Sequence, residues 1–481
     1  MDKPLSLEEI KTRVKKSFLS LIGRRIFLRI IGFITINIIL ARTLPLETLG
    51  IFNIATSIIT FFAFFSDIGL AGSLIQKNKQ VKSEDLSTTF TIQQLLVGSM
   101  TIIIIIFAQF LSDYYRMGLD GVWLIRALAI AFFLSSLKVI PSVMLERNLN
   151  FIPLVWVEIL ETLTFNILLI YLVFKGFGLS SFTYAVLSRG IIGTTAIYLI
   201  APVKIGIGIY KDSLKELANF GIPYQLNNIL ALVKDRLVPL VVARMVGSEQ
   251  FTYITWSQAM AMLPLDILSE VNRLTFPAFS RLQHDKESLS SAVEKTLFVT
   301  VMIIYPLIFG LAAILPAVIS HVVTAKFSPA LLSFYLFAVS AFWAVISTIF
   351  TNVLNAIGRV RTTMKLMIFW TIITWALTPI LVYFYGFIGV GISSFLISFT
   401  SAITIILVKK VLVIRITNAI FIPTLCSLLM GGVVFVYSYY FVRDQLTLAS
   451  AILLGGVVYV SLIFLLARDR VLSGLRELRN G

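Results

Sequence analysis

Ionisable side chains recur inside segments of the chain that are otherwise strongly apolar, and they are the residues best suited to chemistry. Arginine and lysine bind phosphate groups through charge-assisted hydrogen bonds, and seven lie in the interiors of these segments, away from the basic residues at their ends: Arg29, Arg126, Lys138, Arg189, Lys234, Arg236 and Arg273. A charged group in apolar surroundings is costly, so each is a candidate functional residue. Because the positive charges outnumber the negative ones, we predict a net-basic site for a phosphate or pyrophosphate.

Uncharged polar residues accompany the charged ones, and four of them are candidates: Asn53, Gln225, Asn228 and Gln258. Each shares a helical sector with a charged candidate at about 100° per residue. Their amides suit hydroxyl-rich ligands such as sugars. The predicted substrate-binding residues are therefore Arg29, Asn53, Arg189, Gln225, Asn228, Lys234, Arg236, Gln258 and Arg273.

The acidic candidates have several interpretations. Glu158 and Glu161 lie one helical turn apart, and two carboxylates at that spacing could share a proton or hold a cation. Alternatively, they pair with Arg126 or Arg189 and only hold helices together. The residues that we predict to contact sugars or to couple a cation, H⁺ or Na⁺, are Asp67, Glu158, Glu161, Asp235, Asp266 and Glu270.

Residues for other kinds of site are scarce. The chain has one cysteine, Cys426, and two histidines, His284 and His321, that lie far apart in the sequence. It contains no Gly-x-x-x-x-Gly-Lys-Ser/Thr motif for cradling the phosphates of ATP. We expect no metal, no bound cofactor, no nucleic-acid partner and no catalysis. Since an ATP site is lacking, any energy-requiring step must draw on an ion gradient, a membrane potential or a substrate gradient.

The composition identifies the elements that position these groups. Hydrophobic residues make up 58% of the 481 residues and charged ones 13%, against roughly 45–50% and 25% in soluble domains. These values exclude a soluble enzyme, a disordered chain and a disulfide-built secreted domain. A membrane-crossing helix needs about 20 mostly apolar residues, and we predict fourteen: 21–44, 50–75, 86–111, 122–144, 151–174, 180–202, 219–245, 251–277, 293–322, 330–356, 362–385, 387–408, 418–441 and 446–467.

The basic residues predict the orientation of these helices. With both termini placed in the cytoplasm, and with basic residues near the ends of the predicted helices counted with the adjoining loop, 27 of the 40 Lys and Arg residues fall on the cytoplasmic side and six on the outer side. This asymmetry agrees with the positive-inside rule. Residues 1–20 read as a basic amphipathic segment on the cytoplasmic surface, and we expect a multi-pass protein of the cytoplasmic (inner) membrane.

An internal repeat divides the predicted bundle. Residues 41–47 and 243–249 share Ala, Arg and Glu at an offset of 202 residues, and the helices that follow carry similar polar faces. Six helices per repeat make the two halves parallel, as in two-lobed transporters. We predict a segment 1–20, a six-helix lobe 21–202, a linker 203–218, a second lobe 219–410, two added helices in 411–467 and a cytoplasmic tail 468–481.

Several stretches of the chain resemble one family of transporters. They are Lys234 to Arg236, Val242 to Gly247, Leu263-Pro264, Phe276 to Gln283, Leu40 to Pro45, Leu49 to Phe52, Phe65 to Leu70 and Leu74 to Gln76. Over most of residues 15–415 the chain resembles polysaccharide transporters of the Wzx type, in the multidrug/oligosaccharidyl-lipid/polysaccharide exporter superfamily. The motifs Phe-Pro-Ala-Phe-Ser-Arg-Leu-Gln and Phe-Ser-Asp-Ile-Gly-Leu are the specific part of the likeness.

The resemblance implies a flippase rather than an enzyme. Such a protein moves an undecaprenyl-pyrophosphate oligosaccharide to the outer leaflet by alternating access, for assembly of O-antigen, capsule or exopolysaccharide. Membrane lipids and a polysaccharide polymerase or export complex are then expected partners. The alternatives are a cation-coupled multidrug antiporter, a lipid II flippase and a membrane-embedded glycosyltransferase or polymerase. The last would need a large outer loop, which the sequence lacks.

Overall fold

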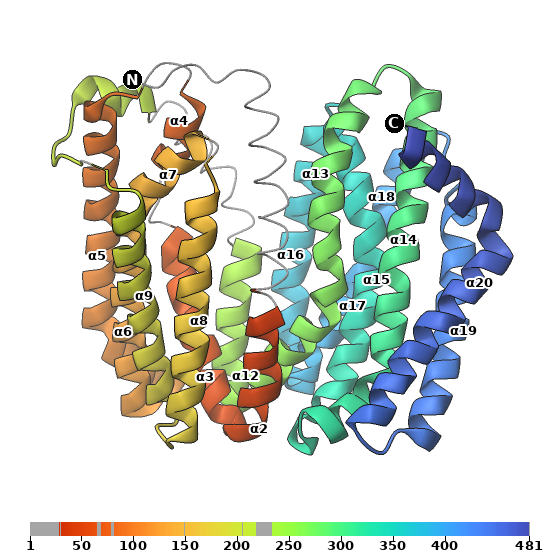
Figure 1. The fold of residues 1–481 in the computed structure, drawn as a ribbon, viewed down its shortest axis with the longest axis horizontal. Helices are drawn as coiled ribbons and strands as arrows, with labels where there is room; N and C mark the ends of the chain where they lie inside the picture. The colour runs from red at the N-terminus through yellow and green to blue at the C-terminus, as the bar shows by residue number, and fades with distance from the viewer. Residues whose placement is uncertain are drawn as a thin grey trace. The chain divides into compact units, whose positions relative to one another are not determined.

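The protein is built from helices, as predicted. The computed structural model describes residues 28, 30–64, 69–77, 81–148, 150–203, 205–217 and 233–480, and every regular element within these ranges is helical (Figure 1). Eleven helical segments there are long and apolar enough to cross a membrane: 46–63, 83–115, 118–147, 152–174, 180–200, 286–322, 330–356, 360–385, 388–409, 416–441 and 445–468. The chain is therefore a multi-pass membrane protein.

The predicted number of fourteen spans is not confirmed. The first span is described only in part, as a shorter apolar stretch, Ile30–Thr43. Residues 218–232 of the seventh span lie outside the described residues, and the eighth, which contains a short 3₁₀ segment, is not among the eleven. The second span is not one continuous helix, since a first helix ends at Ala63 and a second follows Gly69, whose φ of 83° interrupts the helical backbone.

The chain forms two compact units, residues 1–252 and 253–481. The described helices of unit 1 are η1 (Thr35–Leu40), α2 (Ala41–Thr43), α3 (Leu46–Ala63), α4 (Leu70–Gln76), α5 (Ser83–Tyr115), α6 (Gly118–Leu137), α7 (Val139–Arg147), α8 (Ile152–Phe174), α9 (Ser180–Ile200), η3 (Val233–Leu237) and the first part of α12 (Val238–Met262). Within this unit α6 packs on both α5 and α9, and α9 also packs on α8.

Unit 2 contains the remaining helices. They are the end of α12, η4 (Leu263–Leu265), α13 (Asp266–Arg281), α14 (Lys286–Ala317), η5 (Val318–Val322), η6 (Ala325–Phe327), α15 (Ala330–Ala356), α16 (Val360–Tyr385), α17 (Ile388–Phe399), α18 (Ala402–Lys409), α19 (Ile416–Phe441) and α20 (Gln445–Asn480). Helix α19 packs along α14, and α20 packs on α19 (Figure 1). The two helices predicted as an addition thus cover α14.

The predicted repeat is visible in the backbone at two helix junctions. Pro45, with ψ of 149°, separates α2 from α3, and Gly247, with φ of 82°, interrupts α12. These two breaks lie 202 residues apart, which is the offset read from the sequence.

The residues that follow these junctions pack against each other within unit 1. Thr252 Oγ1 donates a hydrogen bond to the carbonyl oxygen of Leu46 at 2.8 Å. A Cβ atom at Gly50 would lie 1.8 Å from the carbonyl oxygen of Ser248. Under the 202-residue offset, Leu46 is equivalent to Ser248, and Gly50 is equivalent to Thr252. In both contacts, therefore, the first position of one repeat meets the second position of the other repeat. Reciprocal contacts of this kind are a property of two-fold symmetry.

The segment of residues 205–217, which follows α9, lies along the first turns of α5. The backbone N–H groups of Gly208 and Tyr210 donate to the hydroxyls of Thr91 and Thr88 at 2.9 and 3.0 Å. Ser73 donates to the carbonyl of Leu217 at 2.9 Å. The buried leucine side chain at 217 joins an apolar cluster with residues of α4, α5 and α7. The segment 205–217 is therefore held against α4, α5 and α7 by both hydrogen bonds and apolar contacts.

Candidate functional site

Three ionisable residues meet inside unit 1 of the structure. Glu161 of α8 is 4% exposed. One of its carboxylate oxygens, Oε1, accepts a hydrogen bond from Lys138 Nζ, and the other, Oε2, lies 3.7 Å from Arg189 Nε. Lys138 stands between α6 and α7, and Arg189 is on α9, so the charges join three helices. One carboxylate and two cations leave this group with a net charge of +1.

A small residue on α9 makes this approach possible. A Cβ atom at Gly193 would lie 1.7 Å from Glu161 Oε1, so any larger residue would displace the carboxylate. Two side chains near Gly193 also tie α9 to the end of α6. Thr194 Oγ1 donates to the carbonyl of Leu134 and the Tyr198 hydroxyl donates to that of Leu137, both at 2.9 Å.

The side chain of Glu158 is exposed on an unexpected side of α8. The exposed large apolar residues of that helix form one row at about 100° per residue: Trp156, Leu160, Ile167, Tyr171 and Phe174. Glu158 is exposed roughly opposite this row, on the face that is otherwise buried. An apolar row of this kind suits lipid, whereas a carboxylate exposed on the protein-facing side suits water or a polar ligand.

Arg189 lies at one side of the exposed apolar residues of its own helix. It is roughly 130° around α9 from the row of Tyr184, Ile191 and Leu199, but nearer to Ile192 and Ile200, which are also exposed. Its side chain is 51% exposed, and its guanidinium lies 5.9 Å from the centre of the Phe165 ring. The guanidinium is therefore half-exposed beside an aromatic ring.

The three charges at residues 234–236 lie together in one helical turn, directly before α12. They occupy the π-helical turn η3. Lys234 Nζ is 3.4 Å from Asp235 Oδ1, and the carboxylate of Asp235 is 57% exposed. Arg236 is exposed. An exposed ion pair contributes little to stability, so the turn presents Arg236 beside a pair that is largely solvated.

In unit 2 the polar candidates gather on α13. Asp266, Ser269, Glu270 and Arg273 fall on one side of this helix, and Leu268 and Phe279 are buried on the other. Arg273 is exposed, and Asp266 and Glu270 are half-buried. Gln258 on α12 is also exposed. The predicted polar face of this segment is therefore present.

The remaining candidates are more dispersed. Asn53 is half-buried on α3, and its carbonyl accepts a hydrogen bond from Ser57 at 2.8 Å. Arg126 lies 5.3 Å from the Trp123 ring on its own helix rather than beside Glu161. Four predicted site residues lie outside the described residues: Arg29, Asp67, Gln225 and Asn228. No cluster that could hold a metal ion occurs among the described residues.

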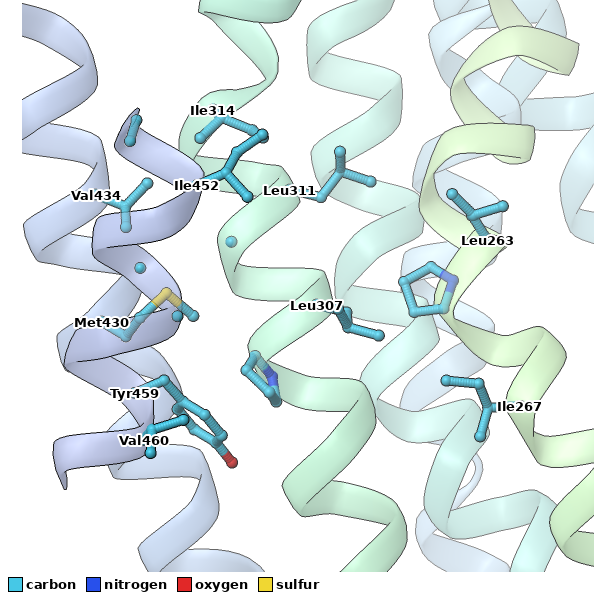
Figure 2. Close-up of a pocket in the computed structure, with 16 residues that line it drawn as sticks. Leu263, Ile267, Leu307, Leu311, Ile314, Met430, Val434, Ile452, Tyr459 and Val460 are labelled. Atoms are coloured by element: carbon cyan, nitrogen blue, oxygen red, sulfur yellow. The ribbon is translucent and has the colours of Figure 1, made fainter. Parts of the chain in front are cut away.

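An apolar pocket lies within unit 2, and the sequence analysis did not predict it (Figure 2). Its volume is about 500 Å³. Nearly every side chain lining it is hydrocarbon, and Gly310, Gly455 and Gly456 leave room beside them. The Tyr459 hydroxyl donates to the carbonyl of Met302 at 2.7 Å. The lining residues come from the region of η4 and α13 (Leu263, Pro264, Ile267), from α14 (Pro306, Leu307, Gly310, Leu311, Ile314), from α19 (Met430, Val434) and from α20 (Ala451, Ile452, Gly455, Gly456, Tyr459, Val460).

Comparisons with solved structures agree on the fold. The lipid II flippase MurJ in an inward closed conformation matches 94% of this chain and all of its own, with a TM-score of 0.76 and 17% identity. An inward-facing multidrug resistance transporter of the MATE family, in the MOP superfamily, matches 79% of this chain and 95% of its own, with a TM-score of 0.60 and 16% identity. The chain therefore has the fold of these transporters.

Comparisons of sequence identify the family. An uncharacterized membrane protein in the cps region of Klebsiella pneumoniae is 24% identical over 93% of this chain and 94% of its own. The lipopolysaccharide biosynthesis protein WzxC of Escherichia coli is 23% identical over 57% of this chain and 56% of its own. The model of the polysaccharide biosynthesis protein family matches residues 39–332, which is more than half of the chain. The chain belongs to the polysaccharide biosynthesis protein family.

Proposed function

We propose that the protein is a flippase that moves a lipid-linked oligosaccharide from the cytoplasmic to the outer leaflet of the cytoplasmic membrane. The observation that carries this proposal is the family match over residues 39–332. Relatives named for the transport step of succinoglycan biosynthesis and for lipopolysaccharide biosynthesis agree with it. The protein acts as a transporter and not as an enzyme.

The chemistry of the described side chains supports this substrate class. A lipid-linked oligosaccharide has an isoprenoid tail, a pyrophosphate and a sugar chain. The pocket of unit 2 is apolar and suits part of a hydrocarbon tail. The exposed guanidinium groups of Arg189 and Arg236 in unit 1, and that of Arg273 in unit 2, each suit a phosphate group. Gln258 and the polar face of α13 suit sugar hydroxyls.

The proposal includes alternating access between inward-open and outward-open states. The likeness in fold to MurJ and to the MATE transporter supports it. We place both termini in the cytoplasm, because 27 of the 40 Lys and Arg residues then lie on the cytoplasmic side. A polysaccharide polymerase would be the partner that consumes the translocated unit.

The energy source in this proposal is a gradient of H⁺ or Na⁺. Glu161 is a poor candidate for binding such a cation, because two cationic side chains already lie beside it. The other carboxylates named from the sequence, which remain the candidates for coupling, are Asp67, Glu158, Asp235, Asp266 and Glu270. Glutamine or asparagine at the responsible position would remove the dependence of transport on the ion gradient.

The experiment that tests the function is lipid analysis of a strain that lacks the protein. We expect a complete oligosaccharide unit linked to polyprenyl pyrophosphate to accumulate, with loss of surface polysaccharide, and mass spectrometry would identify the sugars. Unchanged lipids together with increased sensitivity to drugs or dyes would instead support the cation-coupled antiporter, and accumulation of lipid II would support the peptidoglycan precursor.

A further inference from the structure

The two cations beside Glu161 are held very differently. Lys138 Nζ donates a hydrogen bond to Oε1, and its side chain is only 18% exposed. Arg189 Nε lies 3.7 Å from Oε2, which is beyond hydrogen-bond distance, and its side chain is 51% exposed. Lys138 therefore neutralises the carboxylate, and Arg189 is only loosely attracted to it.

The orientation of Arg189 leaves part of its guanidinium unused. Its Nε edge faces Glu161, and Phe165 lies beside the group at 5.9 Å. The structure gives this guanidinium no other ion pair or hydrogen bond to any described residue. The two terminal amino groups can form a bidentate contact with a phosphate, which a lysine ammonium, as a point charge, cannot reproduce.

We propose that Lys138 keeps Arg189 available for the substrate by occupying Glu161. Arg189 is the residue that binds an oxyanion of the pyrophosphate, and Lys138 and Glu161 are positioning residues that do not touch it. This inference rests on the proposed function and assigns one part of its binding site.

The reason lies in the cost of an uncompensated buried carboxylate. Without Lys138, Glu161 would be a buried anion within 4 Å of one remaining cation, and such an anion is strongly destabilising unless it is paired. A small movement of Arg189 would then close the 3.7 Å separation into a full ion pair. The same guanidinium would no longer be free to bind phosphate.

Variants of this group separate a specific role from a simple effect of charge. The single change Lys138→Met lowers the charge of the group from +1 to zero. The double variant Lys138→Met with Glu161→Gln restores +1 and retains Arg189. The double variant Arg189→Gln with Glu161→Gln also has +1 but retains only Lys138. Replacing both members of a buried ion pair is often neutral for folding, so the first double variant should fold normally. The second leaves the Lys138 ammonium, which is 18% exposed, without its carboxylate, so its binding is compared only if its melting temperature matches that of the first.

The test measures binding of inorganic pyrophosphate to the full-length protein in lipid nanodiscs by titration calorimetry, with melting temperatures recorded for every variant. We expect Lys138→Met to weaken binding about tenfold, the size of one charge-assisted hydrogen bond. The double variant Lys138→Met with Glu161→Gln, which retains Arg189, should bind pyrophosphate as tightly as the wild type. The double variant Arg189→Gln with Glu161→Gln, which retains only Lys138, should not. Lys77→Met is the control, since Lys77 also pairs with a buried carboxylate, Asp85, at 2.9 Å, but at another place in unit 1.

Two results would overturn the inference while leaving the flippase proposal intact. Equal binding by the two double variants would show that only net charge matters. Unchanged binding in a folded Lys138→Met protein would show that Lys138 does not protect Arg189. If the wild-type protein bound no pyrophosphate although the deletion strain accumulated the lipid-linked oligosaccharide, the assignment of this site would be wrong and the function would stand.

Discussion

A single methyl group at Gly50 should disturb the reciprocal contact between the two helix junctions. In Gly50→Ala the new Cβ would lie 1.8 Å from the carbonyl oxygen of Ser248, whereas an ordinary contact begins near 3.4 Å. The two backbones must therefore separate by roughly 1.6 Å, because a backbone carbonyl cannot turn aside as a flexible side chain can. This movement also breaks the hydrogen bond from Thr252 to Leu46.

The expected cost follows from these two contacts. Overpacking costs about 1–3 kcal/mol, and the lost hydrogen bond costs about 0.5–1.5 kcal/mol. The higher helix propensity of alanine returns about 0.5–1 kcal/mol. We therefore expect a net loss of about 0.5–4 kcal/mol, with a middle value of about 2 kcal/mol.

Thermal unfolding of the purified protein in nanodiscs provides the assay. A cost of this size should lower the melting temperature by several degrees, at roughly 2–4 °C per kcal/mol. Gly432→Ala on α19 is the matched control, because a Cβ there meets nothing within 4 Å, and it should keep or slightly raise the melting temperature. If Gly50→Ala melted at or above the wild-type temperature, the close approach of the two junctions would not exist in the membrane.

Three further predictions concern other parts of the chain. Burial of the Lys77 ammonium opposes its charge, but hydrogen bonds and attraction from Asp85 and Glu216 outweigh this and raise its pKa. The contribution of this ammonium to the stability of the fold should be full below about pH 10.4 and fall as the pH rises through the raised pKa. Melting curves recorded at several pH values should therefore lose this part of the alkaline dependence in Lys77→Met. Gly456→Leu should fill the apolar pocket, because a Cβ at Gly456 meets nothing within 4 Å. This variant should transport less lipid in proteoliposomes, whereas Gly432→Leu, outside the pocket, should transport as much as the wild type. Equal transport by the two variants would exclude the pocket from the transport pathway. Arg236→Ala should abolish polysaccharide export and Arg236→Lys should retain part of it, and normal export by a stably expressed alanine variant would remove Arg236 from the site.

Much of the fold could be predicted because a membrane allows few alternatives. Lipid requires every backbone polar group to be bonded within the segment, so long apolar runs become helices. Charged groups must avoid lipid, and α13 therefore has the polar face that its spacing predicts. Two breaks in the helical backbone, at Pro45 and Gly247, also lie at the offset that the sequence predicts for the repeat.

The contacts of the site could not be predicted in the same way. Lys138 and Glu161 are 23 residues apart, and their meeting depends on how α6 and α8 are each placed against α9, which packs on both. The sequence analysis named Arg126 or Arg189 as the partner of the carboxylates; Arg189 is near Glu161, but the hydrogen-bonded partner is Lys138. The one available signal was Gly193, whose lack of a side chain gives the carboxylate its space. The apolar pocket left no signal, because its lining comes from separate helices with ordinary membrane composition.

The central claim is that this protein itself moves a lipid-linked oligosaccharide across a bilayer. The most direct measurement reconstitutes the purified protein in liposomes that carry the lipid extracted from the deletion strain, and follows the sugars that become accessible to a membrane-impermeant glycosidase or lectin on the opposite side. We predict transfer that requires the protein and falls in Arg189→Gln. Transfer at the rate of protein-free liposomes, under the ion gradients tested and with correctly folded protein, would contradict the account.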